Sequence, residues 1–279
     1  MPGIRVVTDS ASDLPPDLAS AEGVAVVPLD VRLGDLSASE TASLSLEEFW
    51  DRCAHSDDLP RTAAPSPGAF AAAFAAARDA GCDAAVCVTI SSKLSATYQS
   101  AVTGAAELAP DFPVIVVDSE LATMGEGLLV LEAAERARAG MAATQLEEHL
   151  RAAIGSIATF GTLDSLDYLR RGGRIGAAAA LLGSLLSVKP VIEVRAGVVE
   201  AESRQRTRSR SLAYLAAKVR DAGPLKRLAV VHAAAKDLDV FLALLADVHP
   251  VEEVITAYIG PVIGAHTGPG TVGVCLQRR

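Results

Sequence analysis

The first half of the chain alternates apolar runs typical of strands with segments that carry apolar residues at helical spacing. The expected strands are the β-branched runs at residues 4–8 and 24–27 and the continuous apolar runs at 84–90 and 114–117. The expected helices lie at residues 46–53, 67–80, 95–108, 124–139 and 145–154. Continuous apolar strands between helices are typical of a parallel sheet covered on both faces, so we predict a Rossmann-like α/β domain.

The second half has a different pattern, which predicts an α+β domain. Residues 157–163 form an expected strand, and residues 188–194 and 198–201 form an expected hairpin. The remaining expected helices and strands lie at residues 165–171, 211–220, 228–231, 241–245, 254–259 and 271–275. Placing the boundary where the pattern changes gives one domain of residues 1–155 and another of residues 156–279.

Composition and charge exclude one class of partner. The 279 residues are 50% hydrophobic and 21% charged, so the chain can form a packed core. Lys and Arg total 25 against 34 Asp and Glu, which gives a net charge of −9. Phosphate groups are repelled by most of such a surface, and aromatic residues, at 4%, are too few for base-stacking platforms. We therefore expect no nucleic-acid partner.

Cysteine and histidine usage gives no metal or disulfide signature. The four cysteines form no CxxC pair, and the five histidines form no HxH or HExxH motif. We expect buried free thiols in a reducing compartment and no metal or other cofactor. The opening MPGIRVVTDS is unlike a signal peptide, and the longest nearly apolar stretch, at residues 175–188, is too short to span a bilayer. The expected location is the cytoplasm.

Hydroxyl-rich loops follow three of the predicted strands. Residues 8–10, 91–92 and 118–119 come directly after strands, and the carboxyl ends of parallel strands form the edge at which ligands bind. Residues 91–98 alone hold four Ser and Thr hydroxyls at a helix start, which needs only one or two caps. The surplus favours donors aimed at an anionic ligand at a helix N-terminus.

Two further segments carry candidate ligand-binding groups. Ser66 and Pro67 suit the N-cap and the first position of a helix, which leaves Thr62 without a structural role. Residues 260–270 are glycine-rich and show no helical or strand pattern, so we expect a loop in which His266 has no packing role. Histidine is also the side chain best suited to hold or release an anion near neutral pH.

Seven arginines gather in two segments of this acidic chain. A solvated face would account for them, but their concentration favours a docking patch for an acidic partner or a phosphate. They are Arg170, Arg171, Arg174, Arg204, Arg206, Arg208 and Arg210.

Motifs in order along nearly the whole chain resemble those of the DegV family, the bacterial fatty-acid-binding proteins also called FakB. Alanines stand at positions 63, 64 and 96 where the family usually has Ser, Gln and Gly. The matching segments are residues 7–15 (VTDSASDLP), 62–66 (TAAPS, for TSQPS), 91–100 (SSKLSATYQS, for SSxLSGTYxS), 167–175 (DYLRRGGRI), 189–191 (KPV) and 266–270 (HTGPG, for HxGPG).

The resemblance implies a protein that buries one long-chain fatty acid between two domains. It places the carboxylate on Thr62 and Ser95, with His266 nearby and Ser92 and Ser66 as weaker candidates. It also implies a separate ATP-dependent fatty acid kinase, which converts the bound fatty acid to an acyl-phosphate for phospholipid synthesis. The chain has no Walker A sequence, as expected of a binding subunit that is not itself an enzyme.

The same resemblance suggests how partners would meet the protein. The two arginine segments are the expected docking sites for the kinase, and transient contact with a membrane surface is also expected. Two other functions stay open. One is a hydrolase with a loop serine as nucleophile and His266 as base, although the chain has no GxSxG elbow. The other is a lipid carrier or regulator without a kinase partner.

Overall fold

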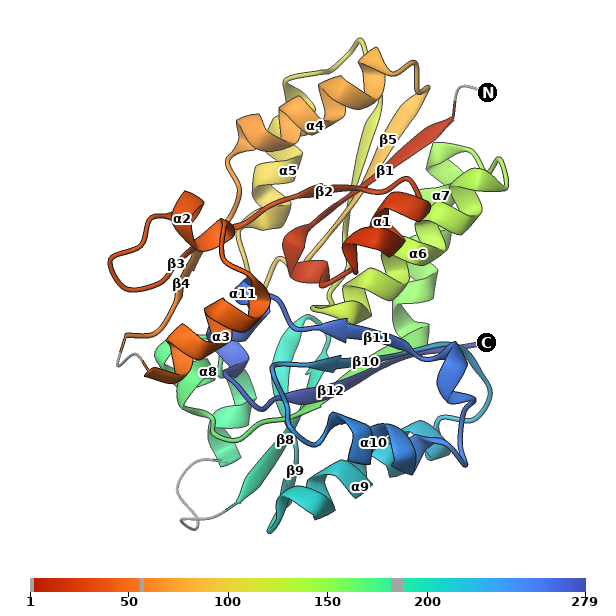
Figure 1. The fold of residues 1–279 in the computed structure, drawn as a ribbon. Helices are drawn as coiled ribbons and strands as arrows, with labels where there is room; N and C mark the ends of the chain where they lie inside the picture. The colour runs from red at the N-terminus through yellow and green to blue at the C-terminus, as the bar shows by residue number, and fades with distance from the viewer. Residues whose placement is uncertain (1–2, 56–57, 182–187) are drawn as a thin grey trace.

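The computed structural model describes residues 3–55, 58–181 and 188–279, which fold around two sheets (Figure 1). The elements before the second sheet are β1 (Ile4–Asp9), α1 (Pro16–Ala21), β2 (Ala25–Val27), β3 (Asp30–Arg32), α2 (Ala38–Ala42), α3 (Leu46–His55), β4 (Arg61–Ala63), α4 (Pro67–Asp79), β5 (Ala84–Thr89), α5 (Thr97–Ala106), β6 (Val114–Asp118), α6 (Met124–Arg138) and α7 (Ala143–Ala153). A 3₁₀ turn, Ser10–Ser12, follows β1.

The remaining elements build the second sheet and its helices. They are β7 (Ile157–Thr162), α8 (Asp167–Arg171), β8 (Lys189–Arg195), β9 (Val198–Gln205), α9 (Arg208–Asp221), β10 (Leu225–His232), α10 (Leu238–Leu245), β11 (Ile255–Tyr258), α11 (Pro261–Thr267) and β12 (Val272–Arg278). Three 3₁₀ segments accompany them, at Ile154–Ser156, Gly176–Leu181 and Val251–Glu253.

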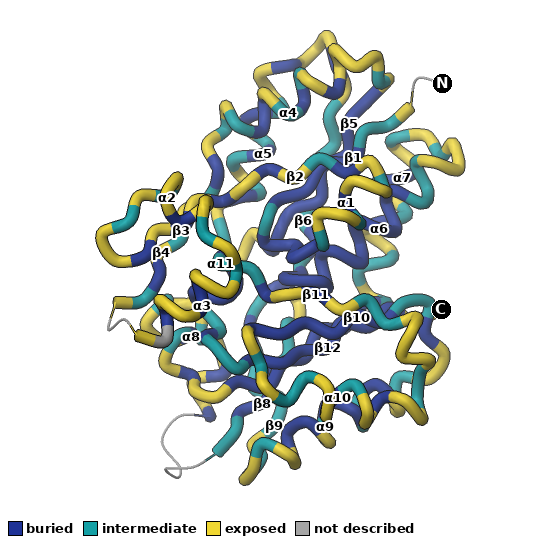
Figure 2. Tube along the Cα trace, viewed as in Figure 1, coloured by how far each residue is buried: buried dark blue, intermediate teal, exposed yellow. Residues whose placement is uncertain are grey.

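The first sheet is parallel and buried on both faces, as the sequence predicts. Its strand order is β2-β1-β5-β6, and all six residues of β5 are buried. Successive residues of β1 point to opposite faces: Val7 packs with Phe70 and Phe74 of α4, whereas Val6 packs with Leu128 of α6. Helices on both faces therefore exclude water from the centre of the sheet, where β5 and most of β1 are dark in Figure 2.

The second sheet is mixed, with the order β11-β10-β12-β7-β8-β9. Strands β10 and β11 pair in parallel, whereas the other neighbours are antiparallel. Helices α9 and α10 cover its outer face, where Leu215 and Phe241 pack against Phe160 and Val230. The predicted fold class, a parallel α/β sheet followed by an α+β unit, is confirmed.

Helix α6 lies between the two sheets. Every residue from 124 to 134 is buried, although the sequence there is only moderately apolar. The helix contacts β1 and β5 of the first sheet and β7, β10 and β12 of the second. The predicted division of the chain at residue 155 falls after α7 and before β7, and we keep it as a proposal because α6 packs against both sheets.

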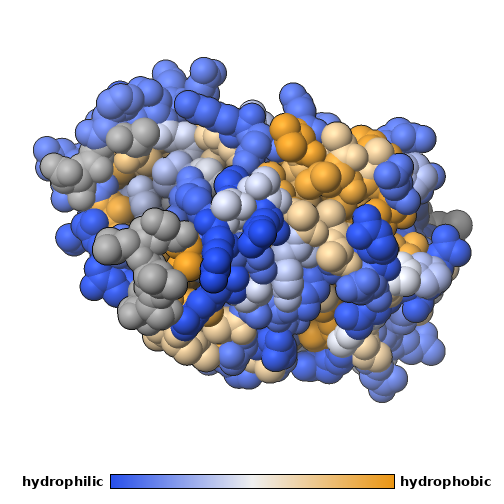
Figure 3. Space-filling view, turned by 90° about the horizontal axis from the view of Figure 1, so that it is seen from below, coloured by the Kyte–Doolittle hydropathy of each residue, from blue (hydrophilic) through white to orange (hydrophobic). Residues whose placement is uncertain are grey.

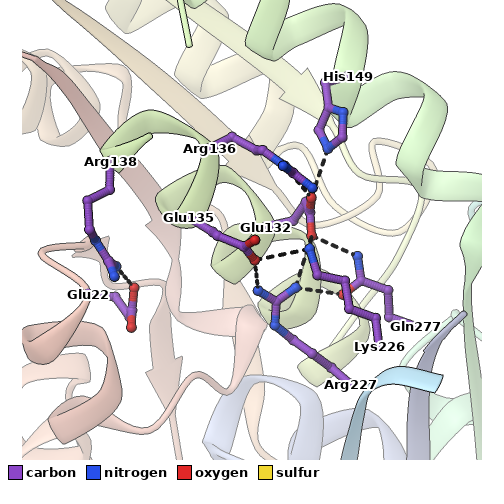
Figure 4. Close-up of polar contacts among 9 residues, drawn as sticks. All are labelled: Glu22, Glu132, Glu135, Arg136, Arg138, His149, Lys226, Arg227 and Gln277. Carbon is purple, nitrogen blue, oxygen red and sulfur yellow. Dashed lines mark hydrogen bonds and ion pairs between the residues drawn. The ribbon is translucent and has the colours of Figure 1, made fainter. Parts of the chain in front are cut away.

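A network of charged side chains joins α6 to the second sheet (Figure 4). Its centre is Glu132, whose side chain is 3% exposed. Burial would raise the pKa of this carboxyl, but hydrogen bonds from Lys226, His149, Arg136 and Arg227 outweigh burial and hold the pKa well below its usual range. Gln277 of β12 also donates to Glu132, at 3.1 Å between Nε2 and Oε2. The network therefore ties α6 and α7 to β10 and β12.

The structure corrects one prediction of local structure. Residues 261–267 form the helix α11 and not a loop. Gly260 is its N-cap and Pro261 its first residue, a position that proline favours. Gly264 lets the helix approach Trp50 of α3 closely, because a Cβ on Gly264 would lie 2.5 Å from Cη2 of the Trp50 ring. Glycine marks a close approach here and not a turn.

Other differences are small or concern short elements. The sequence pattern carries no signal for α1, α2 or the antiparallel pair β3–β4, whose strands have only three residues each. Of the near-apolar stretch at residues 175–188, residues 182–187 lie outside the described part of the chain. In the part that is described, none of the helices combines the length and the apolar character needed to cross a membrane.

Candidate ligand-binding site

A cavity with mostly apolar walls lies between the two sheets. Its space free of atoms, counting the part open to solvent, is about 850 Å³. Its wall combines residues of the second sheet with residues from the segments after β2 and β5, from β4, from the start of α6, and from α8 and α11. Apolar members of this wall include Ile90, Leu163, Leu169, Ile192, Val231 and Val262.

Polar side chains also line the cavity, and two of them are in contact. Thr62 of β4 and His266 of α11 are joined by a hydrogen bond of 3.1 Å between Oγ1 and Nε2. Ser95 lines the same cavity just before α5, and its Oγ lies 2.8 Å from Oγ1 of Thr97. Thr62 and His266, which lie 204 positions apart in the sequence, thus meet at one site. The structure brings together the three residues that the sequence ranks first.

Arg174 adds a positive charge to the wall of this cavity. Its Nε donates to the backbone carbonyl of Leu94 at 3.1 Å, and its Nη1 donates to the carbonyl of Gly172 at 2.9 Å. These bonds fix the guanidinium beside the segment that carries Ser95. The sequence predicts Arg174 as a docking residue, whereas the structure also places it in the cavity wall.

His266 is uncharged at neutral pH in this structure. Burial, together with the charge of Arg174, lowers its pKa to about 4. Its Nδ1 has no hydrogen-bond partner among the described residues. The ring is held by packing, because a Cβ on Gly172 would lie 2.4 Å from Nδ1. His266 therefore offers an anion a hydrogen bond and not a charge, which differs from the expected titration near neutral pH.

The two weaker candidates lie elsewhere. Ser66 is exposed and caps α4, where its Oγ accepts from the N–H of Ala69 at 3.2 Å. Ser92 is exposed and lines a shallow surface hollow that also includes Ser95 and Arg174. The backbone N–H of Ser92 donates to Asp118 at 3.0 Å. Neither side chain lines the main cavity, so the structure gives each a position at the surface.

The remaining candidate docking arginines differ in their surroundings. Arg170 is exposed on α8 and lies 3.4 Å from Asp167, Arg206 is exposed after β9, and Arg171 is exposed at the end of α8. Arg204 is exposed and donates to the carbonyl of Ala180. Arg208 makes a two-pronged ion pair with Asp237, at 2.8 and 2.9 Å.

Buried carboxyl groups lie beyond β1, at the edge where the sequence predicts that polar loops meet. Asp9 accepts hydrogen bonds from the N–H groups of Ala11 and Ile90, both at 2.9 Å, yet burial raises its pKa to about 6. Asp13 accepts from Thr123 at 2.6 Å and from the N–H of Gly260 at 2.9 Å, and burial raises its pKa to about 7.

A third buried carboxyl, Glu126 of α6, completes this group. It accepts from Thr8 at 2.9 Å, and its other oxygen has no partner among the described residues. Burial and the neighbouring charge of Asp9 raise its pKa well above the usual value. Asp13 of this acidic group binds both Thr123, which lines the cavity, and Gly260, which precedes α11. The acidic group therefore helps to hold these two parts of the cavity wall in place. Across the described chain, no set of His, Cys, Asp and Glu side chains is arranged to hold a metal ion.

The geometry favours binding over hydrolysis. A nucleophile and its base need a third group that orients the base, and His266 has no such partner on Nδ1 among the described residues. The hydroxyl within reach of His266 belongs to Thr62, and that of Ser95 is bonded to Thr97. The arrangement supplies neutral hydrogen-bond donors beside an apolar cavity.

Sequence reasoning missed several groups near the polar side chains. Arg61 and Arg32 lie next to Thr62 in the short strand pair β3–β4, and Thr123 lines the cavity at the start of α6. Arg61 directly precedes Thr62 in the sequence and could have been noticed. Arg32 reaches the site only through strand pairing, for which the sequence carries no periodic signal.

Comparison with known proteins points to one family. A family model described as an uncharacterised protein of the DegV family matches residues 3–279. A DegV domain-containing protein of Streptomyces coelicolor is 37% identical over 286 positions, which cover 99% of each chain. A fatty-acid-binding DegV family protein from Thermus thermophilus has 33% identity and a TM-score of 0.88 over 99% of this chain and 100% of that one. A stearic-acid-binding protein from Eubacterium ventriosum has 26% identity and a TM-score of 0.86 over 99% and 98%.

Proposed function

The chain belongs to the DegV family, and we propose that it binds one long-chain fatty acid in the cavity between its two sheets. The observation that carries this proposal is the composition of the cavity wall. Most of the wall is apolar, and Thr62, Ser95 and His266 supply polar groups to it. An apolar cavity with a few convergent polar groups suits a long apolar tail with one anionic head group. The Thermus and Eubacterium relatives, described above as fatty-acid-binding proteins, support the proposal.

The tail supplies most of the proposed affinity. Burying about 14 to 16 methylene groups at about 0.8 kcal/mol each gives roughly 11 to 13 kcal/mol before the costs of association and ordering. The polar groups have a different task. They replace the water that a carboxylate loses on burial, with each hydrogen bond to the charged group contributing about 1.5–3 kcal/mol. The hydroxyls of Thr62 and Ser95 can donate to a carboxylate, and neutral His266 can also donate in the tautomer that carries its proton on Nε2.

We further propose that the protein is the binding subunit of a two-component system and not itself an enzyme. A separate kinase would hold ATP, and a carboxylate oxygen of the bound fatty acid would attack the γ-phosphorus. An O–P bond forms, ADP leaves, and the acyl-phosphate enters phospholipid synthesis. This scheme rests on the family resemblance, and it places the protein in the cytoplasm, where ATP is available. The hollow shared by Ser92, Ser95 and Arg174 supports it, since it gives Ser95 a route to the surface.

Charge reversal tests the docking part of this scheme. Arg170→Glu and Arg206→Glu each remove an exposed cation from one of the two predicted docking segments while leaving the cavity wall intact. We expect acyl-phosphate formation with the kinase to fall at least tenfold and fatty acid affinity to stay unchanged. Arg220→Glu, an exposed position on α9, is the matched control. Undiminished acyl-phosphate formation by both variants would contradict docking through these arginines.

Transient contact with a membrane surface is the last element of the proposal. Val240 and Leu244 of α10 are 60% and 39% exposed. Figure 3 shows a hydrophobic area on the side of the molecule where α10 lies in Figure 1. Co-sedimentation with phosphatidylglycerol vesicles should be weakened by Val240→Asp together with Leu244→Asp. Equal sedimentation of the variant and the parent protein would exclude this surface.

The binding proposal itself is tested by solvent extraction of the purified, folded protein and mass spectrometry of the extract. We expect about one long-chain fatty acid per chain. Calorimetric titration of the delipidated protein should then show binding of the fatty acid and at least tenfold weaker binding of its methyl ester, which lacks the carboxylate. An empty extract with no uptake of added fatty acid would refute the proposal. Equal affinity for the acid and the ester would refute the assignment of the polar groups.

A further inference from the structure

The inner face of the second sheet forms part of the cavity wall, and one row of residues crosses it. Strand pairing places Val231, Gly273, Gly161 and Ile192 side by side on β10, β12, β7 and β8. All four residues line the cavity. Directly opposed residues of antiparallel strands point to the same face of a sheet. The two central positions of this row therefore lack a side chain where their neighbours have branched ones, and we call this recess the glycine gap.

The glycine gap is bordered by larger side chains. Val231 and Ile192 flank it across the strands. Along β7 the nearest positions on the same face are two residues away, at Thr159 and Leu163, and both line the cavity. Neighbouring strands lie about 4.8 Å apart and residues two positions apart on one strand lie about 7 Å apart. The gap is therefore a local recess in the wall and not a channel through it.

The two glycines of the gap differ in how the packing of the protein explains them. A Cβ on Gly273 would lie 2.9 Å from the backbone oxygen of Phe160 and 2.9 Å from Cγ2 of Val231, which is too close for an ordinary contact. The first atom that a Cβ on Gly161 would meet is the backbone oxygen of Val272, at 3.8 Å, an ordinary van der Waals distance. Gly161 also lies in the extended backbone of β7, which any residue adopts.

A glycine at position 161 therefore weakens the strand without a return in conformation or packing. Glycine loses more backbone freedom on folding than other residues, and it offers no side chain to pack. The space that a methyl group on Gly161 would fill belongs to the cavity. Inside a strand, such a glycine often marks a place where a ligand approaches the backbone closely. The ligand that reaches this place lies along the apolar part of the cavity wall.

We propose that the glycine gap receives a methyl branch of the fatty acid tail, and that Gly161 makes the protein select methyl-branched over straight-chain acids. The inference rests on the proposed function, since it needs a tail in the cavity. A branch adds one carbon at one point on one side of the chain, which matches a bordered recess beside a longer cavity. A cis double bond instead turns the direction of the whole chain and needs room beyond the recess.

Calorimetric titration of the delipidated protein tests this inference. The probes are heptadecanoate and its iso, anteiso and mid-chain methyl-branched isomers. All of them have the same number of carbon atoms, so a difference in affinity reports the shape of the tail and not its size. We expect one branched isomer to bind at least about tenfold more tightly than heptadecanoate, the lower end of what one carbon contributes in an apolar pocket. The unbranched cis-10-heptadecenoate measures the response to a bend.

The variant Gly161→Ala places a methyl group of the protein where the branch would lie. We expect the advantage of the preferred branched isomer over heptadecanoate to fall below twofold. Because alanine has less freedom than glycine in the unfolded chain, the same variant should raise the urea midpoint of the delipidated protein. Gly155→Ala is the matched control, since residue 155 lies outside the cavity wall and its Cβ would meet no described atom within 4 Å. It should keep the full preference.

The outcomes separate this inference from the binding proposal. Heptadecanoate that binds as tightly as every branched isomer would overturn the inference and leave fatty acid binding intact. A preference for cis-10-heptadecenoate over all branched isomers would assign the recess to a bend and overturn the branch. A Gly161→Ala variant that keeps the preference, or that lowers the urea midpoint, would overturn the role of Gly161. Failure of every acid to bind would refute the proposed function, and the inference with it.

Discussion

The buried carboxyl of Asp13 makes the stability of the protein fall as the pH rises, and the variant Asp13→Asn measures that effect. Burial raises the pKa of Asp13 from 3.8 to about 7. The folded state therefore holds a proton that the unfolded state has released between these two values. This contribution to stability is complete below about pH 4 and is lost as the pH rises through 7.

Asparagine imitates the protonated form of this side chain. Its carbonyl oxygen can accept the N–H of Gly260, and its amide can donate to Thr123, so both existing contacts keep a partner. Asp13 has φ of 50°, in the left-handed region, which asparagine also tolerates. The substitution thus removes the ionisation with little change in packing.

The expected magnitude follows from the pKa difference. About three pH units at about 1.36 kcal/mol each give roughly 4 kcal/mol at pH 8, and roughly 1.5 kcal/mol at pH 5. The difference in unfolding free energy between Asp13→Asn and the parent protein should therefore grow by about 2.5 kcal/mol from pH 5 to pH 8. Asp9 and Glu126 are present in both proteins, so their own contributions largely cancel.

Urea unfolding at the two pH values provides the measurement. Asp35→Asn removes an exposed carboxyl and should give the same small difference at both pH values. A difference for Asp13→Asn that does not change with pH would show that Asp13 is ionised in both states. A variant less stable than the parent protein at pH 8 would show that the hydrogen bonds matter more than the charge. Either result would refute the reasoning.

Three other substitutions test the site and its support. Thr62→Val removes the hydroxyl that contacts His266 and should weaken fatty acid binding by about 1–2 kcal/mol in calorimetry, with the unfolding midpoint unchanged; full affinity would contradict the role of Thr62. Gly172→Ala places a Cβ 2.4 Å from the His266 ring and should weaken binding as much as His266→Ala, whereas Gly155→Ala, which meets no atom within 4 Å, should not. Glu132→Gln leaves Arg136, Lys226 and Arg227 without their shared carboxylate and should lower the unfolding free energy at pH 7 by about 3–5 kcal/mol; a loss under 1 kcal/mol would show that the network is dispensable.

The sequence predicts the two sheets well because their signal is local. The fully buried β5 is a continuous apolar run, and the α4 helix carries Phe70 and Phe74 one turn apart on the face that packs against the first sheet. The family resemblance is confirmed by the family model and by the relatives. The motifs of that family are enough to identify Thr62, Ser95 and His266 as candidates, although their roles remain proposals.

Other features depend on contacts that no sequence pattern encodes. Glycine-rich segments usually indicate loops, so the sequence pattern predicts no helix at residues 261–267. In α11, however, Gly264 lets the helix pack closely against the ring of Trp50. Arg32 lies next to Arg61 only because β3 and β4, two three-residue strands, pair with each other. The low pKa of His266 comes from burial and from Arg174, which lies 92 positions earlier in the chain.

The position of α6 has a consequence for the way the whole chain unfolds. This helix is buried from residue 124 to 134 because one sheet covers each side of it. Separating the two sheets would expose an apolar stripe of the helix and leave Glu132 without the cations of β10, so neither half retains its core alone. The two sheets should therefore melt in a single cooperative transition. A ligand held between them then raises the midpoint of that transition for both halves at once, even though it touches only a small part of each.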